Sequence, residues 1–431
     1  MNPWTALSGA LSVRLHATAS SRKSVRENTM RSLLLRERRS LRLLVNANTN
    51  NPFDLCSGFI FEPAYLFFEM KGSGGMFIEE LINALPEHIE SALIITPHNR
   101  RYFTSFASSD GFLLVTRKGS IFYTDSRYIE AAQKTIQCCD AEEGKNVFSQ
   151  MREFLSVRNI KNIAVEASGI TVSQFNNLKK NEALSGFELI CDNTLDTSIG
   201  ALRSVKTPEE VKKIKDAQKI AELGFLHMLD FIKKGRTERE VQLELDFFML
   251  RNGAEALSFD TIAVSGVNSS MPHGVPSDKM IENGDFVTLD FGAVVDGYHS
   301  DMTRTVAVGH VSDEQKSVYD TVLKAQQAAF DILKPGLSCV HGDGAARDVI
   351  KEAGFGDYFG HGTGHGVGIE IHELPNLSPK SGAVLVPGNI VTVEPGIYLP
   401  GKFGVRIEDM ALITDNGCEN LTNVQKTLII L

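Results

Sequence analysis

Between residues 286 and 408, charged side chains end or interrupt runs of residues that are otherwise apolar. Burying one such carboxylate without a partner costs several kcal/mol, so isolated charges of this kind are rare inside strands. Several of them in one stretch of chain are best explained if the fold brings them together around a shared cation. The residues of this pattern are Asp290, Asp301, His365, Glu394 and Glu408.

The two aspartates flank a predicted hairpin. Asp290 follows the apolar run 286–289, and Asp301 comes eleven residues later, beyond a turn at Asp296 and Gly297. The strands of such a hairpin place both carboxylates at the same end of one sheet.

Each glutamate belongs to a further apolar run. Glu394 ends the run 391–393, and Glu408 lies within the run 405–413, which we predict to be one strand. Because side chains alternate along a strand, Arg406 shares a face with Glu408, where it steadies that carboxylate or meets a substrate.

His365 stands in the glycine-rich run 360–368, whose small residues leave room beside the histidine rings. The run lacks the Lys-Ser/Thr ending of a phosphate-binding loop and the spacing of a dinucleotide-binding turn, so we reject both interpretations. Carboxylates with one imidazole suit Mn, Co, Zn or Fe better than Ca or Mg. Four carboxylates exceed the charge that one divalent ion needs, which predicts two metals.

The chain of 431 residues is long for one core, and two domains are expected. Residues 76–200 alternate short apolar runs with helical patterns, which predicts a small α/β domain without a catalytic cluster. Residues 201–431 hold the whole charged pattern and are predicted to be the catalytic domain. Helices are predicted to begin at Thr207, Thr237 and Ser312, because Glu or Gln follows each of them three residues later.

Residues 1–75 differ from the rest of the chain. Their first part is rich in Arg, Ser and Leu, and Lys71 to Gly75 has the composition of a flexible linker. We predict a basic extension, disordered or non-native, that takes no part in the fold. A targeting segment is the alternative.

The net charge of −9 disfavours nucleic acid as a partner, because phosphate binding needs a basic footprint. No apolar run reaches the ~20 residues of a membrane span, so no membrane partner is expected. The six cysteines form no C-x-x-C pair and are predicted to be reduced thiols of a cytoplasmic protein.

With His273 and His372, the five residues resemble the aminopeptidase P and prolidase group of pita-bread metallopeptidases. The resemblance spans most of residues 76–431, includes Arg-x-x-Lys-Thr-Pro-Glu-Glu at 203–210, and is most specific between 260 and 408. It implies an α/β (α+β) architecture: a creatinase-like N-terminal domain, then a pita-bread catalytic domain. It also implies a homodimer.

The same resemblance implies a role for each residue. Asp290 would bind one metal, His365 and Glu394 the other, while Asp301 and Glu408 would bridge the two. Mn²⁺ is the implied metal, although these ligand types also suit Co²⁺ and Zn²⁺.

The implied reaction is attack of metal-activated water on the carbonyl before proline. Glu394 would carry the proton to the leaving nitrogen, and His372 would hydrogen-bond the oxyanion. His273 would position the substrate or pass protons. Arg406, from its place two residues before Glu408, is expected to contact the substrate or to steady that carboxylate.

The expected activity is that of an Xaa-Pro aminopeptidase acting on proline-containing peptides. Between His372 and Glu394 the only lysine or arginine is Lys380, so the arginine with which some relatives meet a substrate carboxylate is absent. An Xaa-Pro dipeptidase (prolidase) is the alternative, and a catalytically inactive binding protein ranks lower, because such proteins lose ligands. Methionine aminopeptidase would not need the first domain, and creatinase works without metals.

Overall fold

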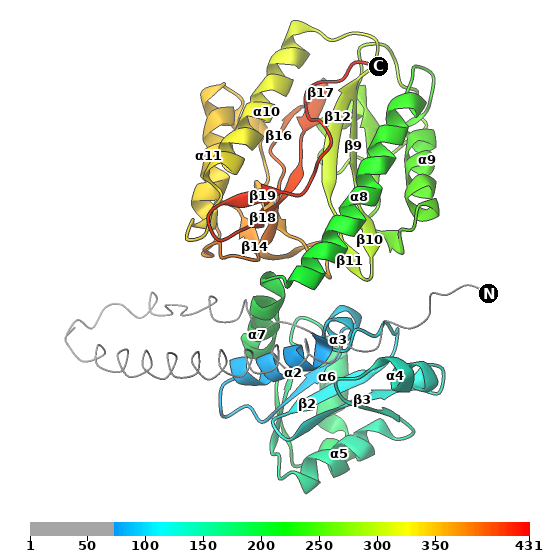
Figure 1. Ribbon diagram of the computed structural model, residues 1–431, viewed down its shortest axis with the longest axis vertical. Helices are drawn as coiled ribbons and strands as arrows, with labels where there is room; N and C mark the ends of the chain where they lie inside the picture. Colours follow the sequence, from blue (N-terminus) through cyan, green and yellow to red (C-terminus); the bar gives the residue numbers. More distant parts are fainter. Residues whose placement is uncertain (1–72) are drawn as a thin grey trace, which may run out of the picture. The chain divides into compact units, whose positions relative to one another are not determined.

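The computed structural model describes residues 73–431 (Figure 1). The predicted basic extension therefore lies outside the described residues, except for its last three. These three residues open helix α2 (Ser73–Ala84). Residues 73–75 are therefore helical, and the prediction of a flexible linker is wrong for them. Phe77, Ile78 and Leu81 of this helix are buried. Packing of this apolar face also stabilises the first helical turn, which precedes them.

Residues 91–190 form a six-stranded mixed sheet in the order β4-β3-β2-β1-β5-β6. Within this sheet, residues 112–124 form a hairpin that turns between Thr116 and Gly119, with Leu114 opposite Ile121. The strands are β1 (Ser91–Ile94), β2 (Phe112–Thr116), β3 (Gly119–Thr124), β4 (Asp140–Glu143), β5 (Asn162–Val165) and β6 (Glu188–Ile190). The helices around them are α3 (Pro97–Thr104), α4 (Ile129–Thr135), α5 (Val147–Val157), α6 (Val172–Lys180) and the 3₁₀ turn η2 (Glu182–Leu184).

Helix α7 (Asn193–Ser204) follows, and the predicted domain boundary between residues 200 and 201 falls inside it. That boundary stays a prediction. The three predicted helix starts are confirmed, because Thr207, Thr237 and Ser312 each complete a capping box. They open α8 (Pro208–Phe231), α9 (Glu238–Arg251) and α10 (Asp313–Ile332).

The second half of the chain packs helices against both sides of its strands (Figure 1). One core joins α8 and α9 to β8, β9 and β12, and another joins α10 and α11 (Cys339–Glu352) to β15–β18. The sheets are β12-β9-β8, β11-β10-β7, β14-β13-β15-β18-β19 and β16-β17. Their strands are β7 (Ala256–Leu257), β8 (Ile262–Ser265), β9 (Phe286–Phe291), β10 (Ala293–Val295), β11 (Tyr298–His299), β12 (Met302–Ala307), β13 (Gly364–Gly366), β14 (Glu373–Leu377), β15 (Ile390–Val393), β16 (Gly396–Leu399), β17 (Phe403–Arg406), β18 (Asp409–Ile413) and β19 (Cys418–Asn420), with 3₁₀ turns η3 (Gly266–Ser270) and η4 (Gly356–Tyr358).

A group of ion pairs connects residues 203–206, at the end of α7, to the segment 370–373, which carries His372. Glu373 accepts hydrogen bonds from Arg203 Nη2 at 2.7 Å and Lys206 Nζ at 3.1 Å. Arg203 also reaches Glu370 at 2.7 Å. The two cations balance the two carboxylates, so the segment 370–373 has an ion-pair partner at each of its ends.

Replacing Lys206 with methionine is expected to lower the free energy of unfolding by about 3–5 kcal/mol, because Glu373 would keep a buried charge with only one cation beside it. The matched control is Lys212→Met, whose pair with Asp216 is exposed, so its loss is expected to change the free energy of unfolding far less. Urea unfolding of both variants measures the difference. Equal effects would contradict the importance of the buried pair.

Candidate metal centre

The predicted hairpin brings the two aspartates to one face of a sheet. β9 pairs with β12 so that Asp290 lies opposite Thr303, two residues after Asp301. The predicted turn is present, with Asp296 and Gly297 both at positive φ (49° and 82°), a geometry typical of a tight two-residue hairpin. Asp301 is buried just before β12 begins.

Glu408 occupies a break in the chain. The single strand predicted over 405–413 is wrong: β17 ends at Arg406 and β18 begins at Asp409, in a different sheet. At the break, the Glu408 amide donates to Thr303 O at 3.1 Å, and the Thr303 hydroxyl donates to Glu408 Oε2 at 2.7 Å. Where the chain changes sheets, Glu408 therefore lies next to β12, the strand that begins directly after Asp301.

His365 and Glu394 come from neighbouring strands. His365 lies in β13, and Glu394 follows the last residue of β15. A Cβ on Gly364 would lie 1.9 Å from Thr392 O, so only glycine allows this close approach. His365 Nδ1 lies 3.1 Å from Gly366 O, to which it can donate, so Nε2 is free to face the acids. That nitrogen lies 3.5 Å from both Asp301 Oδ2 and Glu394 Oε1.

The structure thus brings all five predicted residues to one cavity of about 710 Å³. Asp301, His365 and Glu408 offer ligand atoms within 4.8 Å of one another. Glu394 joins them through its 3.5 Å approach to His365, and Asp290 lines the same cavity.

The charges in this group are poorly compensated by the protein. Asp290 Oδ1, Asp301 Oδ1 and Glu408 Oε1 are buried and accept no hydrogen bond within the part of the chain described. Burial and neighbouring carboxylates raise the pKa of Asp301 and of Glu408 well above the usual range, and burial raises the pKa of Glu394 to about 8. Unpaired oxygens of this kind fit divalent cations, which would neutralise them.

The histidine fits the same role. Burial lowers the pKa of His365 to about 4, so its ring is neutral at physiological pH. A metal ligand must be neutral imidazole, and its other nitrogen is commonly held by a hydrogen bond such as the one to Gly366.

Arg406 supports a different carboxylate from the one predicted. Its Nη2 donates to Asp290 Oδ2 at 2.5 Å, and its Nε donates to the Thr303 hydroxyl at 3.1 Å. Its Nη1 lies 2.8 Å from the Tyr398 hydroxyl and 3.3 Å from Pro272 O. Arg406 therefore reaches Glu408 only through Thr303.

The two further predicted histidines also face the cavity. His273 and His372 line it, and both are exposed. The His372 ring meets the His365 ring edge to face, with centroids 4.4 Å apart. Both side chains are therefore accessible to a molecule that enters the cavity.

Sequence reasoning missed Tyr398 of β16. Its hydroxyl lies 2.9 Å from His361 Nε2 and accepts from Arg406, and burial raises its pKa to about 12. No motif marks this tyrosine, because its partners Arg406 and His361 lie 8 and 37 residues away at no recognisable spacing.

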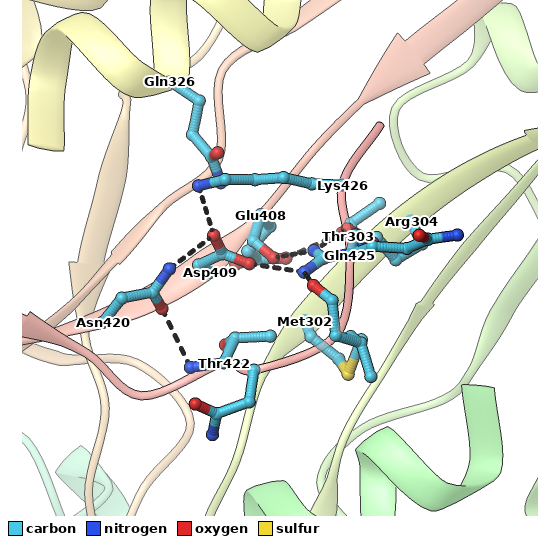
Figure 2. Close-up of polar contacts among 12 residues, drawn as sticks. Met302, Thr303, Arg304, Gln326, Glu408, Asp409, Asn420, Thr422, Gln425 and Lys426 are labelled. Carbon is cyan, nitrogen blue, oxygen red and sulfur yellow. Dashed lines mark hydrogen bonds and ion pairs between the residues drawn. The ribbon is translucent and has the colours of Figure 1, made fainter. Parts of the chain in front are cut away.

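A second missed feature is the network of polar contacts around Asp409, the residue that follows Glu408 (Figure 2). Arg304 donates to the Glu408 carbonyl through Nη1 and to Asp409 Oδ1 through Nη2, both at 2.7 Å. Asp409 Oδ2 accepts from Asn420 at 2.9 Å and from Lys426 at 2.8 Å. These contacts fix the backbone at Glu408 to residues 420–426.

The fold and the acidic centre together define a two-domain metallopeptidase with a pita-bread catalytic half. The chain belongs to metallopeptidase family M24: the model of that family matches residues 212–415. A second model, the creatinase/prolidase N-terminal domain, matches residues 79–190. The family resemblance and the fold class expected from the sequence are confirmed. Among residues 73–431, no helix combines the length and apolar character that a membrane span requires.

The relatives are similar over nearly their whole length. YqhT of Bacillus subtilis, an uncharacterized peptidase, is 43% identical over 358 residues, which are 83% of this chain and 100% of that protein. The Xaa-Pro dipeptidase of Pyrococcus furiosus is 38% identical over 354 residues, 82% of this chain and 99% of that protein.

Solved structures show the same fold. The Xaa-Pro dipeptidase from Bacillus anthracis superposes with a TM-score of 0.80 at 43% identity, over 83% of this chain and 100% of the other. The X-Pro aminopeptidase from Thermotoga maritima gives a TM-score of 0.76 at 36% identity, over 82% and 100%.

Proposed function

We propose that the chain is a dinuclear-metal exopeptidase that hydrolyses the bond between an N-terminal residue and proline, as an Xaa-Pro aminopeptidase. The observation that supports it most is the convergence of four carboxylates and a neutral histidine on one cavity, with three buried carboxylate oxygens unpaired. Proline-containing peptides are the proposed substrates, in line with the names of the relatives.

In this proposal Asp290 binds one metal, and His365 and Glu394 bind the other. Asp301 and Glu408, the most deeply buried of the four acids in this centre, would hold both metals. Divalent ions held there supply Lewis-acid activation of water and of the peptide carbonyl. We propose Mn²⁺; the ligand types also suit Co²⁺ and Zn²⁺.

The side chains around the cavity have separate tasks. Glu394 accepts the proton of the attacking water and delivers it to the leaving proline nitrogen. His372 donates a hydrogen bond to the oxygen that becomes negative, and His273 holds the substrate backbone. Arg406 keeps Asp290 in place with its 2.5 Å bond and forms part of the substrate wall.

An Xaa-Pro dipeptidase is the second candidate, because relatives at 43% and 38% identity carry that name. The missing arginine between His372 and Glu394 favours longer substrates instead. An inactive binding protein ranks lower, since all five proposed ligands are present. The homodimer and the cytoplasmic location stay predictions.

Chelation is expected to abolish hydrolysis of Xaa-Pro peptides, and added Mn²⁺ is expected to restore it, because the unpaired carboxylates need a cation to work together. Metal content per chain and turnover of Ala-Pro and Ala-Pro-Ala are measured on the same sample. Two ions per chain with faster cleavage of the tripeptide would support the aminopeptidase. Full activity after exhaustive chelation would contradict the proposal.

A further inference from the structure

The cavity wall holds two arginines with different surroundings. Arg406 is buried, and Asp290, Tyr398, Thr303 and Pro272 occupy its guanidinium. Arg239, in the first turn of α9, is exposed on the same wall. Within residues 73–431, no carboxylate lies within ion-pairing distance of Arg239.

The nearby acids of α9 are committed elsewhere. Glu238 is buried and accepts from Ser265 and Ser277, and Glu240 completes the cap with Thr237. Neither carboxylate is therefore available to Arg239. Its only side-chain partner among the described residues is the neutral Gln242.

Gln242 extends the donor surface. Arg239 Nη1 donates to Gln242 Oε1 at 2.9 Å, one helical turn along α9. Because the amide oxygen is the acceptor, the amide NH₂ group remains as a donor. Gln242 also lines the cavity, so the pair presents guanidinium and amide N–H groups at the same wall.

In the proposed function divalent ions neutralise the acidic centre, so a carboxylate that enters the cavity is bound best by a further cation whose donors are open. The lining includes the five residues of the acidic centre together with exposed Asp260. Arg239 is the lining arginine whose donors the protein leaves open, and guanidinium recognises carboxylates with two parallel hydrogen bonds.

We propose that Arg239 and Gln242 form a carboxylate-binding subsite that selects among peptide substrates. This inference rests on the proposed peptidase function and deepens it. The carboxylate has two sources: the free C-terminus of a short peptide, or the side chain of an acidic first residue. In either case the subsite acts on substrate binding, so its removal raises KM and leaves kcat nearly unchanged.

The test compares substrates that differ only in this charge. Ala-Pro is paired with Ala-Pro amide, and Glu-Pro amide with Gln-Pro amide. For Arg239→Ala, kcat/KM is expected to fall about 10- to 100-fold for the charged member of one pair. The uncharged members are expected to change less than about 3-fold. Loss in the first pair identifies the C-terminus and favours the Xaa-Pro dipeptidase, the second candidate function. Loss in the second pair identifies the first side chain.

Two further variants separate recognition from folding. Arg239→Lys keeps the charge without the planar fork and is expected to recover part of the loss. Arg251→Ala removes the same charge at the other end of α9, outside the cavity, and is expected to change neither pair. Equal loss on charged and uncharged substrates, or no loss on either, would overturn the subsite alone. No turnover of any of the four peptides by the unsubstituted, Mn²⁺-loaded protein would overturn the proposed function and the subsite with it.

Discussion

Replacing Glu394 with glutamine is expected to reduce kcat for Xaa-Pro hydrolysis by about 10²–10⁴-fold while the fold is retained. Glutamine has the same shape and keeps an oxygen that can accept from Thr392, which lies 3.2 Å from Glu394 Oε1. It cannot take up a proton, so transfer to the leaving nitrogen fails. Steady-state kinetics with thermal unfolding of the same sample measure both parts of this expectation.

The matched control for this substitution is Glu419→Gln, because Glu419 is exposed and pairs with Lys215 outside the cavity. It makes the same chemical change and is expected to leave kcat unaltered. Metal content is measured for both variants, since Glu394 is also a proposed ligand. Wild-type turnover in a metal-loaded Glu394→Gln variant would rule out the proton-transfer role.

Features that depend on neighbours in the sequence could be predicted. The helix starts at Thr207, Thr237 and Ser312 follow from a cap and its partner three residues later. The hairpin between Asp290 and Asp301 follows from its two-residue turn. In each case the deciding contacts are local, so the pattern alone determines the structure.

Features that depend on distant partners could not be predicted. The break before Glu408 arises because the chain changes sheets there, which an unbroken apolar run does not reveal. Arg406 reaches Asp290 across 116 residues, and Arg304 reaches Asp409 across 105. The ligand types could be predicted from the cost of burying charge, whereas the residues that orient them could not.

The metal-free protein is expected to lose stability as the pH rises from about 7 to about 8. The pKa of Glu394 is about 8 in the folded protein, above the usual value near 4.5, and the pKa values of Asp301 and Glu408 are raised in the same direction. The folded state therefore holds protons that the unfolded state has released, and each such proton costs about 1.4 kcal/mol per pH unit. Below pH 6.5 the effect is opposed, because burial lowers the pKa of His365 and His361 to about 4.

Bound divalent ions are expected to remove this loss, because they neutralise the same carboxylates without protons and stabilise the folded state by mass action. The test measures thermal unfolding at about pH 7 and about pH 8, after chelation and again with saturating Mn²⁺. Mn²⁺ should therefore raise the melting temperature more at the higher pH. In the metal-free protein, Glu394→Gln should reduce the fall, because the amide does not titrate, whereas exposed Glu419→Gln should leave it unchanged. A chelated protein that is more stable at pH 8 than at pH 7 would show that these carboxylates are not buried together as protonated acids.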